Sequence, residues 1–233
     1  MGNILSTHDF RNLFKPPVDV TFSSSNIKFM TNYSNFPEAP PYQIRAHFTD
    51  KIIRVYQAYS DDIADAALKQ GTFVSPPFSM TRMTWIKPSF LWMMYRSNWA
   101  RKDIGQQRIL AIDISHEGFE WALTHAALSH CPPHMTHEEW RKWKDASPVV
   151  IQWDPERDLL FRPLAHRSLQ IGLGPTAVNL YVNDWIRNIT DVTPLAKSVG
   201  VLVDAGRYDE VLDLLPVEKI FEPSFKMITP ENT

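Results

Sequence analysis

Apolar and polar positions follow a clear pattern early in the chain. The segment 51–59 is rich in β-branched and aromatic residues, which predicts a strand. Ser60 follows as a candidate N-cap, and residues 61–70 carry apolar residues at helical spacing with acidic residues in the first turn. Gly71 is a natural helix stop. The sequence therefore predicts a strand, a helix and a stop in direct succession.

The rest of the chain predicts short elements of both kinds. Residues 73–88 contain three prolines and predict an irregular loop. Further helices are predicted at 89–99, at 117–128, at 136–144 with a capping box of Thr136 and Glu139, at 176–189, and at one or two places within 195–215 around Gly206. Further strands are predicted at 108–114, 149–153, 158–162 and 168–173, with a turn at Asp154-Pro155. Short strands, several helices and no βαβ rhythm favour an α+β fold.

Length and composition fit one globular domain. A chain of 233 residues with 44% hydrophobic and 21% charged residues can bury one large core, which excludes wholesale disorder. We predict a loosely structured arm at 1–40, a compact α+β domain with mostly antiparallel strands and flanking helices at 41–215, and a C-terminal tail at 216–233. The net charge of −2 gives no global field that would recruit nucleic acid, although a local basic patch could.

Cysteine use and the N-terminus bear on location. Cys131 is the only cysteine, so no disulfide can form within the chain, which favours a reducing, cytoplasmic compartment. The sequence contains no apolar run of about 18 residues and no secretory signal pattern. Gly2 followed by Ser6 matches the N-myristoylation pattern, with coincidence as the alternative because the pattern is short. One acyl chain would give only weak peripheral membrane association.

Cationic and aromatic side chains are interleaved between Arg45 and Gln170. Arginine matches phosphate with its planar fork, and an aromatic ring offers a face to a base. We therefore expect a site for a phosphate-bearing aromatic ligand: a nucleotide, another phosphorylated small molecule or a nucleic-acid end. The expected ligand-binding residues are Arg45, Arg54, Tyr56, Gln57, Arg82, Trp85, Lys87, Arg96, Arg157 and Arg167. The alternative is a solvated charged face with cation–π pairs that serve packing alone.

Residues 81–96 sharpen this expectation, because they place three cations beside bulky apolar side chains without one acidic residue. Burying a cation is costly unless a carboxylate or an anionic ligand compensates it. Asp154 and Glu156 are the obvious carboxylates, and Glu156 is also the candidate general acid or base. A charged turn between two strands is the alternative interpretation of that segment.

A second group of chemistry-bearing residues lies between these segments. It consists of His125, His130, Cys131, His134 and His137. Imidazole and thiolate are zinc ligands, but this spacing matches no familiar zinc pattern, and Pro132-Pro133 indicates a surface loop. We therefore expect no metal site here.

Several long motifs resemble one family. They are Ile53-Arg-Val-Tyr-Gln-Ala-Tyr-Ser60, the run from Arg82 to Arg96, Gln152-Trp-Asp-Pro-Glu-Arg-Asp158 and Arg167-Ser-Leu-Gln-Ile-Gly-Leu173. These motifs resemble the domain-of-unknown-function family numbered 4291 over roughly residues 45–193. That resemblance implies no activity, because the family is named for lacking one.

A more remote resemblance points to a reaction. The strand ending in Tyr56-Gln-Ala-Tyr59, a short helix and Gly71-Thr-Phe73 resemble the opening of ADP-ribosyltransferase-like domains. The resemblance implies that the strand lines an NAD pocket and that Arg45 or Arg54 meets the diphosphate. It also places Glu156 or Gln170 where those enzymes keep a catalytic Glu. With Tyr59, these two complete the candidate catalytic residues.

Three functions remain as alternatives, of which the third is a membrane-tethered interaction protein if Gly2 is acylated. The first is a nucleotide-handling enzyme with NAD as its candidate cofactor, acting by ADP-ribosyl transfer. The second is a non-catalytic module that binds single-stranded nucleic acid or a phosphorylated partner. A deep closed pocket around Arg54, Tyr56, Arg82, Lys87 and Arg96 would favour the enzyme, and a shallow open face would favour the module.

Overall fold

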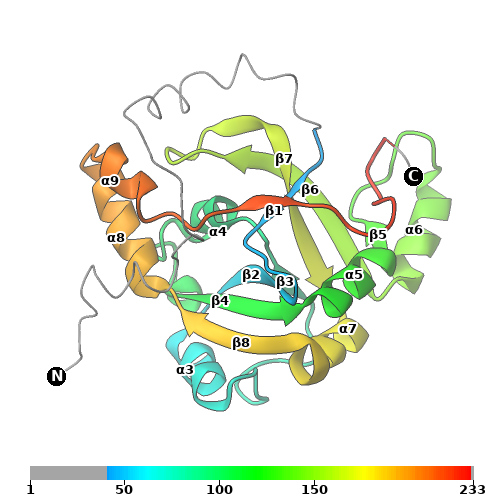
Figure 1. Cartoon of the computed structure of the whole chain (residues 1–233). Coiled ribbons are helices and arrows are strands. Elements are labelled where there is room, and N and C mark those ends of the chain that lie inside the picture. Colours follow the sequence, from blue (N-terminus) through cyan, green and yellow to red (C-terminus); the bar gives the residue numbers. More distant parts are fainter. Residues whose placement is uncertain (1–40, 232–233) are drawn as a thin grey trace.

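The computed structural model describes residues 41–231 (Figure 1). The predicted arm at 1–40 and the acylation pattern at Gly2 lie outside the described residues. Within the described part, no helix has the length and apolar character needed to cross a membrane.

The described residues form short strands and helices in mixed order, which confirms the predicted α+β class. The strands are β1 (Ile44–Ala46), β2 (Ile52–Tyr59), β3 (Thr84–Ile86), β4 (Arg108–Ser115), β5 (Ala126–Leu128), β6 (Val149–Arg157), β7 (Pro163–Leu173), β8 (Ile186–Asp191) and β9 (Lys219–Phe221). The helices are α3 (Asp61–Gln70), α4 (Phe90–Ser97), a 3-10 helix (Ile104–Gln106), α5 (His116–Thr124), α6 (His137–Ala146), α7 (Pro175–Leu180), a π-helical turn (Tyr181–Trp185), α8 (Thr193–Asp204) and α9 (Tyr208–Leu212).

The strands form two sheets and a two-stranded ribbon. One sheet has the order β2-β4-β8, the other has the order β3-β7-β6-β5, and β1 pairs with β9. Figure 1 shows the β1–β9 ribbon crossing between the two sheets. One bridge joins β2 to the end of β3: the Tyr56 amide donates to the Lys87 carbonyl at 2.7 Å, and the Lys87 amide donates to the Tyr56 carbonyl at 3.3 Å. Lys87 therefore lies where the two sheets meet.

Strand β2 separates two hydrophobic cores, because successive side chains point to opposite faces of a strand. Ile53 and Val55 belong to the larger core, which extends between the two sheets. Tyr56 belongs to the smaller core, which α4 and α8 cover. Helix α4 contacts both β2 and β6, so it lies between the two sheets next to Lys87.

Local signals explain the helices that the sequence predicts correctly. Gly71 ends α3 with a left-handed φ of 73°, and its amide donates to the Ala67 carbonyl at 2.8 Å. Ser60 occupies the N-cap of α3 without a side-chain capping bond. Ser89 caps α4 by accepting from the Trp92 amide at 3.1 Å, and Thr136 and Glu139 form the predicted capping box of α6.

The segment 153–163 differs from its prediction. No turn forms at Asp154-Pro155, because β6 continues to Arg157. Residues 158–162 are not a strand, because the chain reverses direction at Asp158. The Asp158 carboxylate accepts hydrogen bonds from the Leu160 and Arg162 amides at 2.9 Å each. Pro155 is tolerated because the neighbouring strand β5 reaches only as far as Ile151 along β6, and the β6–β7 register shifts after Pro155.

Other predicted boundaries are wrong where tertiary pairing decides the structure. The predicted loop at 73–88 contains β3, which pairs with β7. The helix predicted at 117–128 ends at Thr124, because 126–128 pairs with β6. The helix predicted at 176–189 gives way to β8, which pairs with β4. The segment 216–233, predicted as a tail, contributes β9 to the ribbon with β1.

Candidate active site

One face of the β3-β7-β6 sheet carries polar side chains. Gln152 and Asp154 on β6 are register partners of Gln170 and Ser168 on β7, so all four project from the same face. Lys87 directly follows β3, which pairs with β7. Because Ile86 is the partner of Ile171, we place Lys87 beside Gln170 on that same face.

Asp154 is held in a fixed orientation. Its Oδ1 accepts from Gln152 Nε2 at 2.9 Å, and its Oδ2 accepts from Gln170 Nε2 at 2.6 Å. The residue is half-buried, and each carboxylate oxygen has two lone pairs. Asp154 is therefore an oriented carboxylate that can still accept a bond from a ligand.

Lys87 is almost fully buried, with 7% of its surface exposed. Burial lowers the pKa of its amine to about 7; the charge of Arg96 lowers this pKa further, and Asp154 partly offsets the fall. Its Nζ donates to the Trp85 carbonyl at 3.3 Å, and no other residue in the described range accepts from it. Asp154 is thus the carboxylate that acts on Lys87, at longer range than an ion pair.

Trp85 and Arg96 border this lysine. Trp85 is the register partner of Gly172, and a Cβ at Gly172 would lie 3.0 Å from Cζ2 of the Trp85 ring. The half-buried ring therefore lies against the strand at the one position without a side chain. Arg96 is exposed in the last turn of α4. We call Trp85, Lys87, Arg96, Asp154 and Gln170 the lysine face.

Two carboxyl groups lie under the start of α4. Glu156 is 5% exposed and hydrogen-bonds to Ser89 and Ser168, and Glu218 Oε1 accepts from the Phe90 amide at 2.7 Å. Burial raises the pKa of both carboxyls, and the charge of Glu156 raises that of Glu218 further. We call Glu156 and Glu218 the acid pair.

Glu218 is only half-buried as a residue, because it belongs to the surface segment that leads into β9. Its carboxyl group is nonetheless enclosed, since it reaches inward to an amide at the base of α4. The pKa of Glu218 is raised because its carboxyl group is enclosed, even though the rest of the residue is partly exposed.

The charge of Arg45 acts on the acid pair and on His166. Arg45 lowers the pKa of both carboxyls, and its Nε and Nη2 donate to Gln43 Oε1 at 3.2 Å each. Burial, followed by the charge of Arg45, lowers the pKa of His166 to about 4, so His166 is neutral near pH 7. Its Nε2 has no hydrogen-bond partner within residues 41–231.

Four predicted residues lie on β2, where their side chains are engaged in packing, an ion pair or hydrogen bonds, although Gln57 Nε2 also donates at 3.3 Å to the Trp85 carbonyl that accepts from Lys87. Arg54 forms a bidentate ion pair with Asp113 on β4, at 2.7 and 2.9 Å. Tyr56 is fully buried against Phe90, with ring centroids 5.4 Å apart. Gln57 and Tyr59, on the other side of β2, form a buried network. Its bonds join Gln57 Nε2 to Tyr59 Oη and Thr84 Oγ1, Tyr59 Oη to Thr84 Oγ1, and Tyr181 Oη to Gln57 Oε1.

Three other cations that were predicted to bind the ligand lie outside the lysine face. Arg82 is exposed in the segment before β3. Arg157 lies over the Tyr95 ring at 4.1 Å, which is the packing role considered as the alternative for cation–π pairs. Arg167 donates to the Trp153 carbonyl at 3.3 Å, from the face of β7 opposite to Gln170. The fold thus gathers four predicted residues on the lysine face: Trp85, Lys87, Arg96 and Gln170.

The sequence contained a signal for the residues that were missed. Gln152, Asp154 and Glu156 alternate with the buried residues Ile151 and Trp153, which is the period of a strand with one polar face. Interpreting Asp154-Pro155 as a turn interrupted that pattern, so Asp154 was expected only as a carboxylate that compensates the cations of residues 81–96. No comparable local signal marks Glu218 or His166, because their roles depend on contacts with distant segments.

The histidine-rich segment makes local contacts. His125 stacks on Trp121 with ring centroids 4.0 Å apart, and Cys131 Sγ lies 3.3 Å from the Met135 carbonyl oxygen. Within residues 41–231, no three His, Cys, Asp or Glu side chains are grouped to hold a metal ion.

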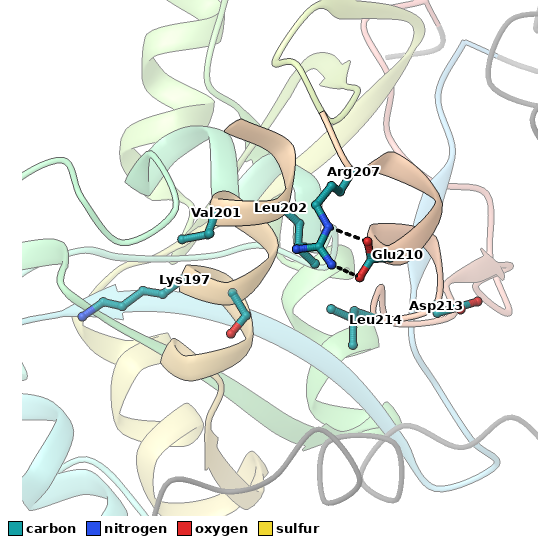
Figure 2. Close-up of a pocket in the computed structure, with 8 residues that line it drawn as sticks. Lys197, Val201, Leu202, Arg207, Glu210, Asp213 and Leu214 are labelled. Atoms are coloured by element: carbon teal, nitrogen blue, oxygen red, sulfur yellow. Dashed lines mark hydrogen bonds and ion pairs between the residues drawn. The ribbon is translucent and has the colours of Figure 1, made fainter. Parts of the chain in front are cut away.

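Two surface hollows lie away from the lysine face. The larger one, of about 670 Å³, lies between α8 and α9, where Arg207 and Glu210 form a bidentate pair beside the apolar side chains of Val201, Leu202 and Leu214 (Figure 2). The smaller one, of about 90 Å³, lies beside Cys131. Neither is lined by residues of the lysine face or the acid pair.

Comparison with known proteins gives a family but no activity. A family model described as "Domain of unknown function (DUF4291)" matches residues 43–221. No curated protein is similar enough to the chain to count as a match.

Proposed function

Because this chain belongs to the DUF4291 family, whose description assigns no chemistry, we propose its function from the lysine face: it binds a nucleotide or dinucleotide and acts on it as an enzyme. NAD is the first ligand to test. The matched region, residues 43–221, contains every residue of the lysine face and of the acid pair.

The observation that carries this proposal is that two cationic side chains, Lys87 and Arg96, lie close enough to repel each other. The two cations are close enough for Arg96 to lower the pKa of Lys87, and no carboxylate in the described chain forms an ion pair with either. An anion between them would remove this repulsion and form charge-assisted hydrogen bonds. Phosphate is the biological anion that best suits a Lys and an Arg together.

Trp85 supports an aromatic group on the same ligand. Its half-buried ring lies on the lysine face, against Gly172 and two positions before Lys87 along the chain. An aromatic ring of this kind can stack a base or a nicotinamide, at about 1–3 kcal/mol per stacked base. A ligand with a phosphate and a planar ring would therefore occupy both parts of the face.

Asp154 is the proposed catalytic carboxylate. In cleavage of NAD, the bond between the ribose carbon and the nicotinamide nitrogen breaks, the electron pair leaves with nicotinamide, and positive charge develops on the ribose. A carboxylate held by Gln152 and Gln170 would stabilise that charge without reorganising. An acceptor oxygen or nitrogen then bonds to the ribose carbon, which removes the positive charge, and the Asp154 carboxylate takes the proton that the acceptor loses.

A second function is favoured by the openness of the face. Trp85 and Asp154 are half-buried and Arg96 is exposed, which is also the arrangement of a module that binds single-stranded nucleic acid through stacking and charge. Such binding would weaken steeply as salt increases and would show no turnover.

Calorimetry with ADP, NAD and a short single-stranded RNA tests the proposal. We expect ADP and NAD to bind, and Lys87→Met and Arg96→Gln each to weaken binding about tenfold or more, because each removes a charge-assisted contact. Arg101→Gln is the matched control, since Arg101 is an exposed arginine four residues after the end of α4 and forms an ion pair with Asp204 at 2.6 Å.

Turnover separates the two functions. Asp154→Asn should abolish release of nicotinamide from NAD while leaving NAD binding within a few-fold. Binding of RNA alone, without turnover of NAD, would support the binding module instead. If none of the three ligands binds, or if Arg101→Gln weakens binding as much as Arg96→Gln, the lysine face is not the ligand site.

A further inference from the structure

Gln152, Asp154 and Gln170 form a hydrogen-bonded row across β6 and β7, which we call the acceptor row. Asp154 Oδ1 accepts from Gln152 Nε2 at 2.9 Å, and Asp154 Oδ2 accepts from Gln170 Nε2 at 2.6 Å. A carboxylate has no hydrogen to donate, so each amide must turn its nitrogen toward Asp154. The carboxylate therefore fixes the orientation of both glutamine amides.

The groups that this row leaves for a ligand are all acceptors. Because Nε2 of each glutamine is held on Asp154, the amide oxygens Oε1 of Gln152 and Gln170 point away from it. No residue within 41–231 donates to either oxygen, and both oxygens are accessible to solvent. A ligand that lies on the acceptor row must therefore bring hydrogen-bond donors.

The rest of the lysine face places those donors on the ring of the ligand. In the proposed function, Lys87 and Arg96 hold the phosphate and Trp85 stacks a planar ring. Trp85 is the register partner of Gly172, two positions from Gln170 on the same face of β7. A nicotinamide ring on Trp85 carries a carboxamide at its edge, and the NH2 of a carboxamide has two N–H donors. These donors match the two glutamine oxygens.

We propose that the acceptor row binds the carboxamide of a nicotinamide ring, so that Gln152 and Gln170 select NAD over dinucleotides whose ring bears a carboxylate. The inference rests on the proposed function and names the part of NAD that gives the site its specificity. A ring carboxylate has no donor for the two oxygens and adds a negative charge near Asp154, so both hydrogen bonding and repulsion act against it. Asp154 remains the catalytic carboxylate.

Calorimetry with NAD and three analogues changed at the carboxamide tests the proposal. The thioamide analogue keeps both N–H donors, the methyl-ketone analogue loses them, and the carboxylate analogue loses them and adds a charge. We expect the thioamide to bind within a few-fold of NAD, the methyl ketone about tenfold or more weaker, and the carboxylate weaker still. If NAD binds and the methyl ketone binds equally well, the proposal is wrong and the proposed function stands. If NAD itself does not bind, both fail.

Gln152→Met and Gln170→Met assign the selection to the two glutamines. Methionine keeps a similar length without the amide oxygen, so each variant should reduce the preference for NAD over the methyl ketone several-fold. ADP has no nicotinamide ring and should bind both variants within a few-fold of wild type. Gln106→Met is the matched control, because Gln106 Nε2 also donates to an aspartate, Asp103, at 2.6 Å. An unchanged preference in both variants, or an equal reduction in Gln106→Met, would overturn the assignment.

Discussion

Arg54 and Lys87 are two cations of the same aromatic-rich region, and the fold surrounds them differently. Arg54 has a bidentate carboxylate partner on the next strand, and the side chains of Arg54 and Asp113 are each 11% exposed. Lys87 is buried with a single carbonyl acceptor inside residues 41–231 and a repelling arginine nearby. A buried cation that lacks an ion-pair partner is the better candidate for ligand binding, because a ligand would supply the missing charge.

This contrast predicts that Arg54 serves stability. Arg54→Met leaves Asp113 buried without its partner, so we expect a loss of about 3 kcal/mol in the free energy of unfolding, measured by urea denaturation. The double variant Arg54→Met, Asp113→Asn should recover part of that loss. Nucleotide affinity should stay unchanged in either variant. If nucleotide affinity falls by more than the decrease in the folded fraction explains, Arg54 belongs to the ligand site after all.

The identity of single site residues was only partly predictable from the sequence. Lys87 was predictable because the segment 81–96 holds cations among apolar residues without one acid. Asp154 was also predictable in principle from the alternation along β6. The role of Glu218 was not, because its partner Phe90 is 128 positions away along the chain and only the fold brings the two together.

At the scale of elements, strand β7 shapes the lysine face through an absent side chain. A Cβ at Gly172 would lie 2.9 Å from Met83 Sδ and 3.0 Å from the Trp85 ring. We expect Gly172→Ala to displace the ring, to change tryptophan fluorescence and to weaken nucleotide binding several-fold. The stability cost should be about 1–3 kcal/mol, as is typical for overpacking. Unchanged nucleotide affinity would show that the Trp85 ring has no part in binding.

Helix α3 provides the matched glycine control. Gly71 has a φ of 73° and open space around the position of a Cβ, so Gly71→Ala costs backbone strain alone. We expect about 1 kcal/mol of destabilisation, measured by urea denaturation, with nucleotide affinity unchanged. An effect of Gly71→Ala on affinity equal to that of Gly172→Ala would mean that both variants act through general instability.

Elements with local signals were predictable, and elements defined by pairing were not. Helices α3 and α6 follow from their stop and capping residues, which act within a few positions. Strand β8 has a sequence that continues a helical pattern, and only its pairing with β4 makes it a strand. Strand β3 lies among prolines and forms because β7 provides its partner.

At the scale of the whole molecule, the buried lysine should reduce stability in return for binding. Lys87 has a folded pKa of about 7, below its ordinary value of 10.5, so the unfolded chain binds more protons between these values. Stability from this group therefore rises with pH across that window and is lowest below it. Lys87→Met should unfold at least about 3 °C higher than wild type at pH 6, the shift expected for about 1 kcal/mol.

The advantage of Lys87→Met should shrink as pH rises from about 7 toward 10.5, because the folded wild type then carries a neutral amine. Thermal unfolding of both proteins across this range measures the difference. A constant difference in unfolding temperature at every pH would mean that packing, and not the charge of Lys87, sets the effect. The same series separates this dependence from that of the acid pair, whose raised carboxyl pKa values make its contribution to stability fall as pH rises.

The titration of Lys87 itself tests the central claim most directly. Nitrogen-15 and carbon-13 NMR of the Lys87 side chain gives its pKa in ligand-free protein and with saturating ADP. The lysine face as described predicts a pKa of about 7 in the free protein and a clear rise when the phosphates of ADP add negative charge beside the amine. A free pKa near the ordinary 10.5, or no change on adding ADP, would contradict it.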